Sequence, residues 1–252
     1  MTESIFYGLV YAWIALACIT FLSLFFVTAP FGRHTSDDWG PNINARWGWF
    51  LMELPSPLLL SFFFFTGESS PNKVTLIFWG LWMLHYFNRS VIYPLRQRDH
   101  KKKMPVMIMG SAIFFNFING FVNGYFLGNY GNLYTDAWLS SPIFWIGMAV
   151  FALGMFINIQ SDNILLSLRK PGETAYKIPK GGLFKYLSCP NLFGEIVEWT
   201  GFAIMMCSLP AFSFALWTFA NLSPRAIAHH KWYHNKFEAY PKERKAVLPF
   251  IW

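Results

Sequence analysis

The chain has 252 residues, of which 54% are hydrophobic, 20% aromatic and only 13% charged. A soluble domain carries about 25% charged residues, so this composition argues against a soluble enzyme and predicts one membrane domain over residues 1–252. The net charge of +7 does not indicate a nucleic-acid partner, because the basic residues stand between apolar runs and form no continuous patch.

The first apolar run begins at Ile5, and no Lys or Arg precedes it or occurs before Arg33. A secretory signal begins with a basic region, so this run is predicted to be a retained span. Seven apolar segments approach the 20 or so residues that a membrane span needs. They cover about 5–28, 47–66, 74–94, 104–127, 141–166, 191–208 and 210–228. The sequence therefore predicts an all-α protein with seven transmembrane helices.

The boundary between the last two segments depends on Ser208, Leu209 and Pro210 alone. Proline lacks a helix donor and disfavours helical geometry in the residue before it. A tight hairpin and a single kinked helix are both compatible with this break.

The distribution of Lys and Arg predicts the topology. Four connecting segments, which seven spans place on one side, hold 18 of the 20 Lys and Arg: 29–46, 95–103, 167–190 and the tail from Arg225. Because cytosolic loops are enriched in basic residues, the N-terminus is expected outside and the C-terminus in the cytosol. Six spans would put the basic tail on the opposite side.

Three cysteines, Cys18, Cys189 and Cys207, have neither paired nor metal-ligand spacing. Neither a disulfide nor a bound metal is expected.

Two of the predicted helices carry polar pairs at a spacing of four residues. Asn158 and Asp162 form one pair, and Asn191 and Glu195 form the other. Residues four apart share a helix face, so both helices are expected to point polar faces at one place.

Glu53 and Tyr86 lie deeper in the predicted bundle. They stand roughly 9 Å and 12 Å from the cytosolic ends of their spans, at 1.5 Å per residue. Ionisable groups inside a bilayer are costly and often functional. Glu53 could instead hold helices together by pairing with Arg89 or His85, but Pro55 next to it interrupts the helical ladder, as suits a cavity wall.

Four motifs in order identify a resemblance to the steroid 5α-reductase family over nearly the whole chain. They are MELPS at Met52–Ser56, HYFNRS at His85–Ser90, LRKPGETAYKIPKGGLFKYLSCPNLFGEIVEW at Leu168–Trp199, and the tail RAIAHHKWYHNKFEAYPKERKAVLPFIW from Arg225. The resemblance implies reduction of the Δ4 double bond of a 3-oxo-Δ4-steroid, with Glu53 and Tyr86 polarising the 3-ketone. Such chemistry needs a donor at the ketone oxygen, where negative charge develops when hydride reaches the β-carbon.

Side chains supply no hydride, so a cofactor is required. No GxGxxG follows a strand, and a Rossmann site is not expected. The resemblance implies NADPH, bound mainly by residues 141–252. It assigns to the cofactor Tyr93, Asn158, Asp162, Arg169, Tyr176, Asn191, Glu195, Arg225, His229 and Tyr233.

Two departures from the family stand out. The basic loop containing Arg96, Arg98 and Lys101–Lys103 is about two residues longer than in the family, so its residues cannot be matched one by one to the family's cofactor contacts. The span near Met109 lacks an Arg that human members carry, so some cofactor contacts must differ.

Asn116, Asn119 and Asn123 share one helix face, for which interhelical hydrogen bonding is favoured over substrate contact. Glu198, one turn after Glu195, suits either a helix-pairing or a cavity role.

Three alternatives remain open at this stage: a membrane enoyl or sterol double-bond reductase, an isoprenylcysteine-type methyltransferase, and a non-enzymatic lipid-binding protein. The preferred hypothesis is a monomeric multi-pass enzyme whose apolar substrate enters from the bilayer. The resemblance suggests a bacterial homologue in the inner membrane; in a eukaryote the membrane would be the endoplasmic reticulum.

Overall fold

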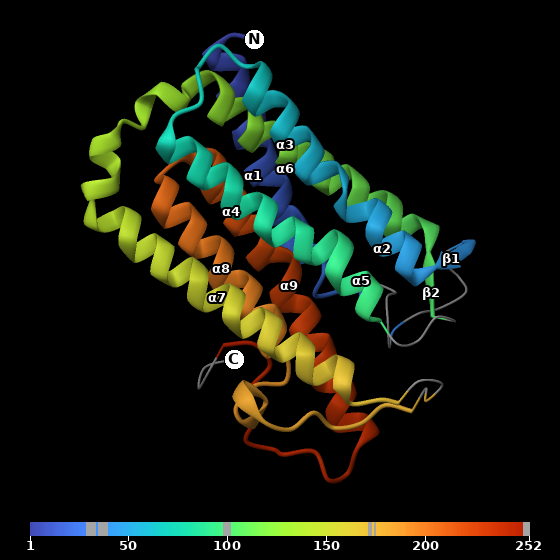
Figure 1. The fold of residues 1–252 in the computed structure, drawn as a ribbon. Helices are drawn as coiled ribbons and strands as arrows, with labels where there is room; N and C mark the ends of the chain where they lie inside the picture. The colour runs from blue at the N-terminus through green and yellow to red at the C-terminus, as the bar shows by residue number, and fades with distance from the viewer. Residues whose placement is uncertain (29–33, 35–39, 98–101, 171–172, 174, 249–252) are drawn as a thin grey trace. The chain divides into compact units, whose positions relative to one another are not determined.

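A computed structural model describes residues 1–28, 34, 40–97, 102–170, 173 and 175–248. The chain divides into two compact units, whose helices and strands are labelled in Figure 1. Unit 1 comprises Met1–Thr28 and Trp145–Trp252, and unit 2 comprises Ala29–Phe144.

Unit 2 is built mainly of helices. Its elements are β1 (Asn42–Asn44), α2 (Ala45–Glu53), α3 (Pro55–Thr66), α4 (Lys73–Phe87), the π-helical segment η3 (Asn88–Ile92), α5 (Tyr93–Arg96), β2 (Lys103–Pro105), α6 (Val106–Tyr130), and the 3₁₀ segments η4 (Gly131–Leu133) and η5 (Asp136–Ser140). Helices therefore occupy the three segments of this unit that the sequence predicts as spans.

Prolines interrupt two of these helices. Pro55 follows the junction residue Leu54. Because Leu54 N still bonds to Phe50 O at 3.2 Å, α3 directly continues α2, and the helix is interrupted only at Leu54. Pro94 has no N–H to donate, and the turn before it widens into η3, where Tyr93 N bonds to Asn88 O. Both breaks lie next to residues that the sequence predicts to be functional.

The sequence predicts no strands, but β1 and β2 pair antiparallel, with Ile43 opposite Met104. Pro105 has the extended geometry of an N-cap, which delays the start of α6 to Val106. The fold is thus mostly helical, with a small two-stranded sheet at the base of α2 and α6.

Glycines on α6 bring it very close to α3. A Cβ on Gly124 would lie 2.7 Å from both the Cα and the O of Leu60, and a Cβ on Gly120 would lie 2.7 Å from Ser56 O. Small residues of this kind permit close helix packing in membranes. The side chains of α6 near Gly120 are consequently held against the α2–α3 segment.

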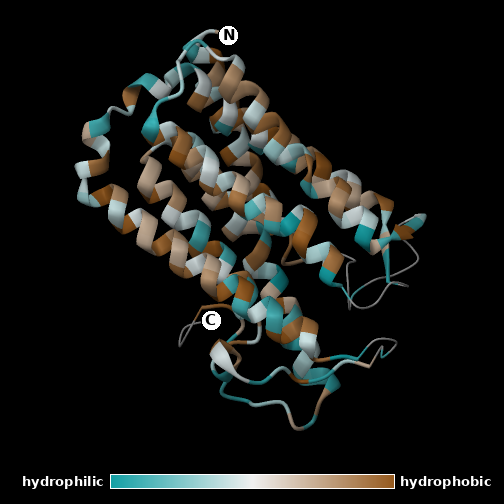
Figure 2. Cartoon of the chain, in the orientation of Figure 1, coloured by the Kyte–Doolittle hydropathy of each residue, from teal (hydrophilic) through white to brown (hydrophobic). Residues whose placement is uncertain are grey.

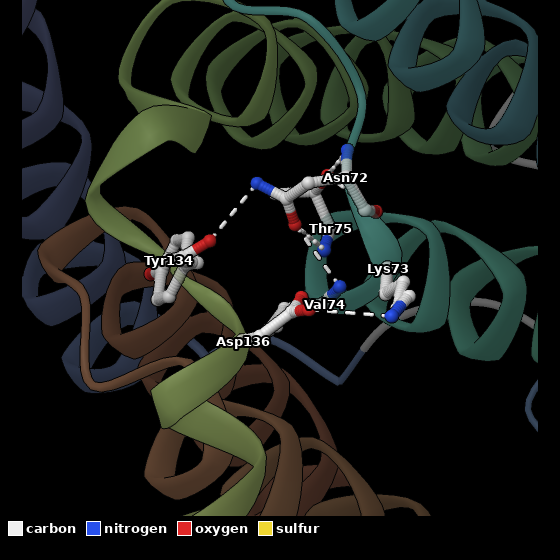
Figure 3. A network of polar contacts seen from close by, with 6 residues as sticks. All are labelled: Asn72, Lys73, Val74, Thr75, Tyr134 and Asp136. Atoms are coloured by element: carbon white, nitrogen blue, oxygen red, sulfur yellow. Dashed lines mark hydrogen bonds and ion pairs between the residues drawn. The ribbon is translucent and has the colours of Figure 1, made fainter.

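At the N-terminal end of α4, Asn72 caps the helix and also bonds to Tyr134 (Figure 3). Its Oδ1 accepts from the N–H groups of Val74 and Thr75, both at 3.0 Å, and its Nδ2 donates to Gly131 O at 3.2 Å and Tyr134 O at 2.9 Å. The capping box with Thr75 fixes the start of α4, and the two Nδ2 bonds connect it to the segment that follows α6.

Unit 1 contains α1 (Glu3–Ser23), η6 (Gly182–Lys185), α8 (Pro190–Met206), α9 (Leu209–Lys236) and most of α7 (Pro142–Ser167). Cys207 adopts a left-handed conformation with φ 47°, and Ser208 caps α9. The break at Ser208–Pro210 is therefore a hairpin. Antiparallel packing of α8 and α9 buries Ile196 and Leu192 against Leu222 and Ala226.

Among the described residues, four helical segments are long and apolar enough to cross a membrane: Glu3–Ser23, Ala45–Thr66, Val106–Leu133 and Pro142–Ser167. Figure 2 shows hydrophobic colouring along these helices and more hydrophilic colouring in the connections and at the end of α9. α4 is 15 residues long before η3 begins and α8 is 17, short of the 20 or so that a span needs.

Candidate active site

In unit 2, Glu53 and Tyr86 converge on Asn116. The Tyr86 hydroxyl donates to Asn116 Oδ1 at 3.0 Å, while Asn116 Nδ2 donates to Glu53 Oε2 at 3.3 Å and to Met52 O at 2.7 Å. Tyr86 and Asn116 are each 3% exposed, and Glu53 is partly buried. Three helices, α2, α4 and α6, thus bring an acid, a phenol and a carboxamide together, as suits recognition of a carbonyl oxygen.

Aromatic and polar side chains support Tyr86. Its ring stacks on Trp82 with centroids 5.5 Å apart and meets the His85 ring edge-on at 5.1 Å. Trp82 Nε1 donates in turn to Ser56 Oγ at 3.2 Å. Because these side chains are buried, the tyrosine ring is held in one orientation.

Arg89 lies against two aromatic rings. Its guanidinium lies 4.8 Å from the ring centroid of Trp49 and 5.1 Å from that of Tyr93. Tyr93, which the sequence assigns to the cofactor, therefore belongs to unit 2, whereas the other cofactor candidates belong to unit 1.

In unit 1, the polar faces of α7 and α8 meet. Asn158 Nδ2 donates to Asn191 O at 2.9 Å, and Asn191 Nδ2 donates to Asp162 Oδ1 at 3.2 Å. This confirms that the two faces point at one place. Glu195, one turn after Asn191, is only partly buried.

Glu198 is fully buried where α8 crosses α7. A Cβ on Gly154 of α7 would collide with the backbone of Glu198, so the two helices touch at this point. The acid lies at a helix contact.

Three more of the predicted cofactor residues in unit 1, Arg169, Tyr176 and Tyr233, have aromatic contacts. The Arg169 guanidinium lies 5.1 Å from the Tyr176 ring centroid, Tyr176 meets Trp232 at 4.9 Å, and Tyr233 stacks on Tyr240 at 5.0 Å. Arg225, His229 and Tyr233 follow one another at four-residue spacing on α9, so they share a face. A cation and flat rings of this kind are suited to phosphate and ring recognition.

Sequence reasoning missed a hydrogen-bonded cluster beneath this face. Tyr240 donates to Ser188 Oγ at 2.7 Å, and Ser188 Oγ lies 2.6 Å from His230 Nδ1. Burial lowers the pKa of His230, and the nearby positive charges of His234 and Lys245 add to this effect. Burial likewise raises the pKa of Tyr240. No spacing in the sequence joins these distant residues.

The tail returns to the start of α8. Lys245 O accepts from Ser188 N at 2.8 Å, and Ala246 O accepts from Cys189 N at 3.1 Å.

Of the basic loop, Arg96 is exposed at the end of α5, whereas Arg98 and Lys101 lie outside the described residues. Within the described part of the chain, no group of three or more His, Cys, Asp or Glu could hold a metal ion.

Comparison with known proteins gives consistent matches. A family described as 3-oxo-5-alpha-steroid 4-dehydrogenase matches residues 102–252. The steroid 5-alpha-reductase DET2 of Gossypium hirsutum is 42% identical over 241 residues, covering 94% of this chain and 93% of the relative. The 3-oxo-5-alpha-steroid 4-dehydrogenase 1 of Bos taurus is 42% identical over 249 residues (97% and 96%), and that of Homo sapiens is 40% identical over 252 residues (99% and 96%).

Proposed function

Since the chain belongs to the steroid 5-alpha-reductase family, we propose that it reduces the Δ4 double bond of a 3-oxo-Δ4-steroid to the 5α-3-oxosteroid with NADPH. Family membership makes the chain an oxidoreductase, which leaves the methyltransferase alternative without support. The relatives are named for steroid reduction, which favours a steroid over an enoyl thioester as substrate.

The protein is a membrane protein, and we propose the complete topology of seven spans with the N-terminus outside and the C-terminus in the cytosol. The four long apolar helices support a protein with several spans. The basic residues in the connecting segments support the side of the membrane on which each terminus is placed. An apolar steroid dissolves in the bilayer and enters the protein from there.

Glu53 and Tyr86 hold the 3-ketone oxygen of the substrate. When bound, NADPH supplies the hydride that adds to carbon 5. The negative charge that develops on the ketone oxygen is stabilised by the Tyr86 hydroxyl, which donates to it, and by the Glu53 carboxyl, which either donates when protonated or supports the phenol. Protonation of the resulting enolate at carbon 4 completes the reduction.

The polar groups of unit 1 fit a phosphorylated dinucleotide. Arg169, with its guanidinium on Tyr176, offers fixed donors to a phosphate, and Arg225 and His229 lie on the same α9 face as Tyr233. The buried chain of Asn158, Asn191 and Asp162 offers both donors and acceptors to a ribose or a carboxamide. We assign Glu195 and Tyr176 to the same cofactor.

The observation that carries the proposal is the convergence of Glu53 and Tyr86 on a single carboxamide. The test is turnover of testosterone or progesterone by the purified protein with NADPH, compared with an enoyl-CoA. Tyr86→Phe is expected to lower kcat about 100- to 1,000-fold, as loss of an oxyanion donor does, with little change in NADPH affinity. Tyr125→Phe, which removes a hydroxyl from α6 nine residues after Asn116, is the control. Reduction of the enoyl-CoA but of neither steroid would overturn the proposal.

A further inference from the structure

We propose that Asn116 is a positioning residue: its carboxamide sets the direction of the Tyr86 hydroxyl hydrogen and holds the Glu53 carboxyl beside it. This inference rests on the proposed function. The three hydrogen bonds of Asn116 reach two other helices, α2 and α4. Two of them end on Glu53 and Tyr86, the groups assigned to the ketone, and the third ends on Met52 O.

The orientation of the Asn116 carboxamide follows from its surroundings. Met52 O lies 2.7 Å from Nδ2 and can only accept a hydrogen bond. If the amide were flipped, two carbonyl oxygens would face each other at that distance, which is strongly repulsive. Nδ2 must therefore face Met52 and Glu53, and Oδ1 must face Tyr86.

This orientation fixes the proton of the phenol. Because Oδ1 accepts only, Tyr86 must be the donor in their 3.0 Å bond. A ketone oxygen that arrives on the same side of the phenol shares this hydrogen with Oδ1, a neutral acceptor, in a three-centre bond. As negative charge develops on the substrate oxygen, that oxygen becomes the stronger acceptor. The hydrogen that Asn116 has already aimed then bonds more strongly in the transition state than in the bound substrate, which is the condition for a higher kcat.

The backbone of α6 keeps Asn116 in place. One turn further along, Gly120 lies directly against Ser56 of α3, and Gly124 lies against Leu60. The α6 side chains near this seam have little room to shift relative to Met52 and Glu53. The carboxamide is therefore presented from a rigid element.

Asn123 provides a matched contrast. It is fully buried on the same face of α6, but its Nδ2 donates to Asn119 O within its own helix, at 3.1 Å. Substitutions at Asn123 therefore reproduce the loss of stability caused by changing a buried asparagine, without removing a contact to Glu53 or Tyr86.

The first experiment measures steroid turnover by Asn116→Ala, Asn116→Gln and Asn123→Ala in the full-length protein with NADPH. Asn116→Ala and Asn116→Gln are expected to lower kcat by about 10- to 100-fold, since a misplacement of 1 Å costs about this much, with KM changed less. Asn123→Ala should keep the kcat of the original protein. Equal kcat in the Asn116 and Asn123 variants would overturn the proposal.

The second experiment uses Asn116→Asp and gives a readout that loss of packing does not. A charged Asp would place an acceptor against Met52 O and a negative charge beside Glu53. Once protonated, it again offers one donor to Met52 and one acceptor to Tyr86. The ratio of its kcat to that of the original protein should rise as the pH falls. Glu53 from α2, and Tyr86 and His85 from α4, face this position and are present in both proteins, so the pH effects that the two proteins share cancel in the ratio.

A pH-independent ratio for Asn116→Asp, or the same pH dependence in Asn123→Asp, would overturn the positioning role. If Asn116→Ala does not fold, Asn116→Asp and Asn116→Gln still decide the question. Absence of any steroid turnover by the unsubstituted protein would instead contradict the proposed function, so the two failures are distinguishable.

Discussion

The side-chain amide of Asn191 on α8 donates to the carboxylate of Asp162 on α7 at 3.2 Å. Asp162 is 4% exposed, so its charge is held in a site that excludes most water. The bond ties together two helices whose remaining polar groups we assign to the cofactor. If these polar groups bind the cofactor, removal of the Asp162 carboxylate should weaken NADPH binding.

Asp162→Ala is expected to weaken NADPH binding by about 10- to 100-fold, because a hydrogen bond to a charged group contributes about 1.5–3 kcal/mol. The dissociation constant is measured by quenching of intrinsic tryptophan fluorescence. Asn163→Ala, at the exposed neighbouring position on α7, is the control and should bind NADPH normally. Unchanged affinity in Asp162→Ala would remove Asp162 from the cofactor site.

Arg169→Ala tests which phosphate the guanidinium reads. If Arg169 contacts the 2′-phosphate, its loss weakens NADPH more than NADH, because only NADPH carries that group. The ratio of the two dissociation constants should change by about 10-fold or more for one charge-assisted contact. Lys170→Ala removes an exposed neighbouring charge and should leave the ratio unchanged. Equal weakening of both cofactors would assign Arg169 to the pyrophosphate instead.

Much of the helical plan could be predicted because it depends on local chemistry. Apolar runs marked the helices of both units, and Pro210 marked the break between α8 and α9, although the sequence left open whether this break is a hairpin or a kink. The four-residue spacing of Asn158 and Asp162 correctly predicted a face that meets Asn191, because spacing along a helix fixes direction.

What could not be predicted depends on contacts between distant segments. Interhelical hydrogen bonds were predicted for Asn116, Asn119 and Asn123. The prediction is confirmed for Asn116, whereas the Nδ2 groups of Asn119 and Asn123 donate to carbonyls within α6. Helical spacing does not tell which groups on other helices an asparagine meets. The pairing of β1 with β2 escaped prediction because three-residue strands carry no readable alternation. The link from Tyr240 through Ser188 to His230 arises only when the tail folds back.

Gly124→Ala is expected to destabilise unit 2. The added Cβ would lie 2.7 Å from backbone atoms of Leu60, so α3 and α6 must separate, and overpacking of this kind costs about 1–3 kcal/mol. Gly110→Ala is the control on the same helix, since nothing lies within 4 Å of its Cβ position. Thermal unfolding in detergent should show a lower midpoint for Gly124→Ala only. A lower midpoint for both would point to a general effect of alanine on α6.

Cys207 tests the topology with a native side chain. It is exposed in the turn between α8 and α9, which seven spans with an outer N-terminus place outside. An impermeant thiol reagent should label it in intact cells, and Cys207→Ser should abolish that labelling. A cysteine introduced at Lys170, on the predicted cytosolic side, should react only after permeabilisation. Protection of Cys207 together with labelling at position 170 would invert the topology.

His230 makes stability depend on pH. Burial lowers its pKa in the folded protein, with further lowering by the positive charges of His234 and Lys245, while the unfolded chain has the ordinary value of about 6.5. The unfolded state therefore binds more protons below pH 6.5, and the stability contributed by neutral His230 is complete above that pH and decreases as the pH falls through it.

The thermal midpoint should consequently fall between pH 7.5 and pH 5.5 in the original protein, and fall less in His230→Asn. Asparagine keeps an acceptor for the hydroxyl of Ser188, which lies 2.6 Å from His230 Nδ1, but takes up no proton. Because both proteins share every other titrating group, the difference between their slopes isolates His230. Identical slopes would show that its protonation is not linked to folding, and that the Ser188–Tyr240 contact tolerates a charged imidazole.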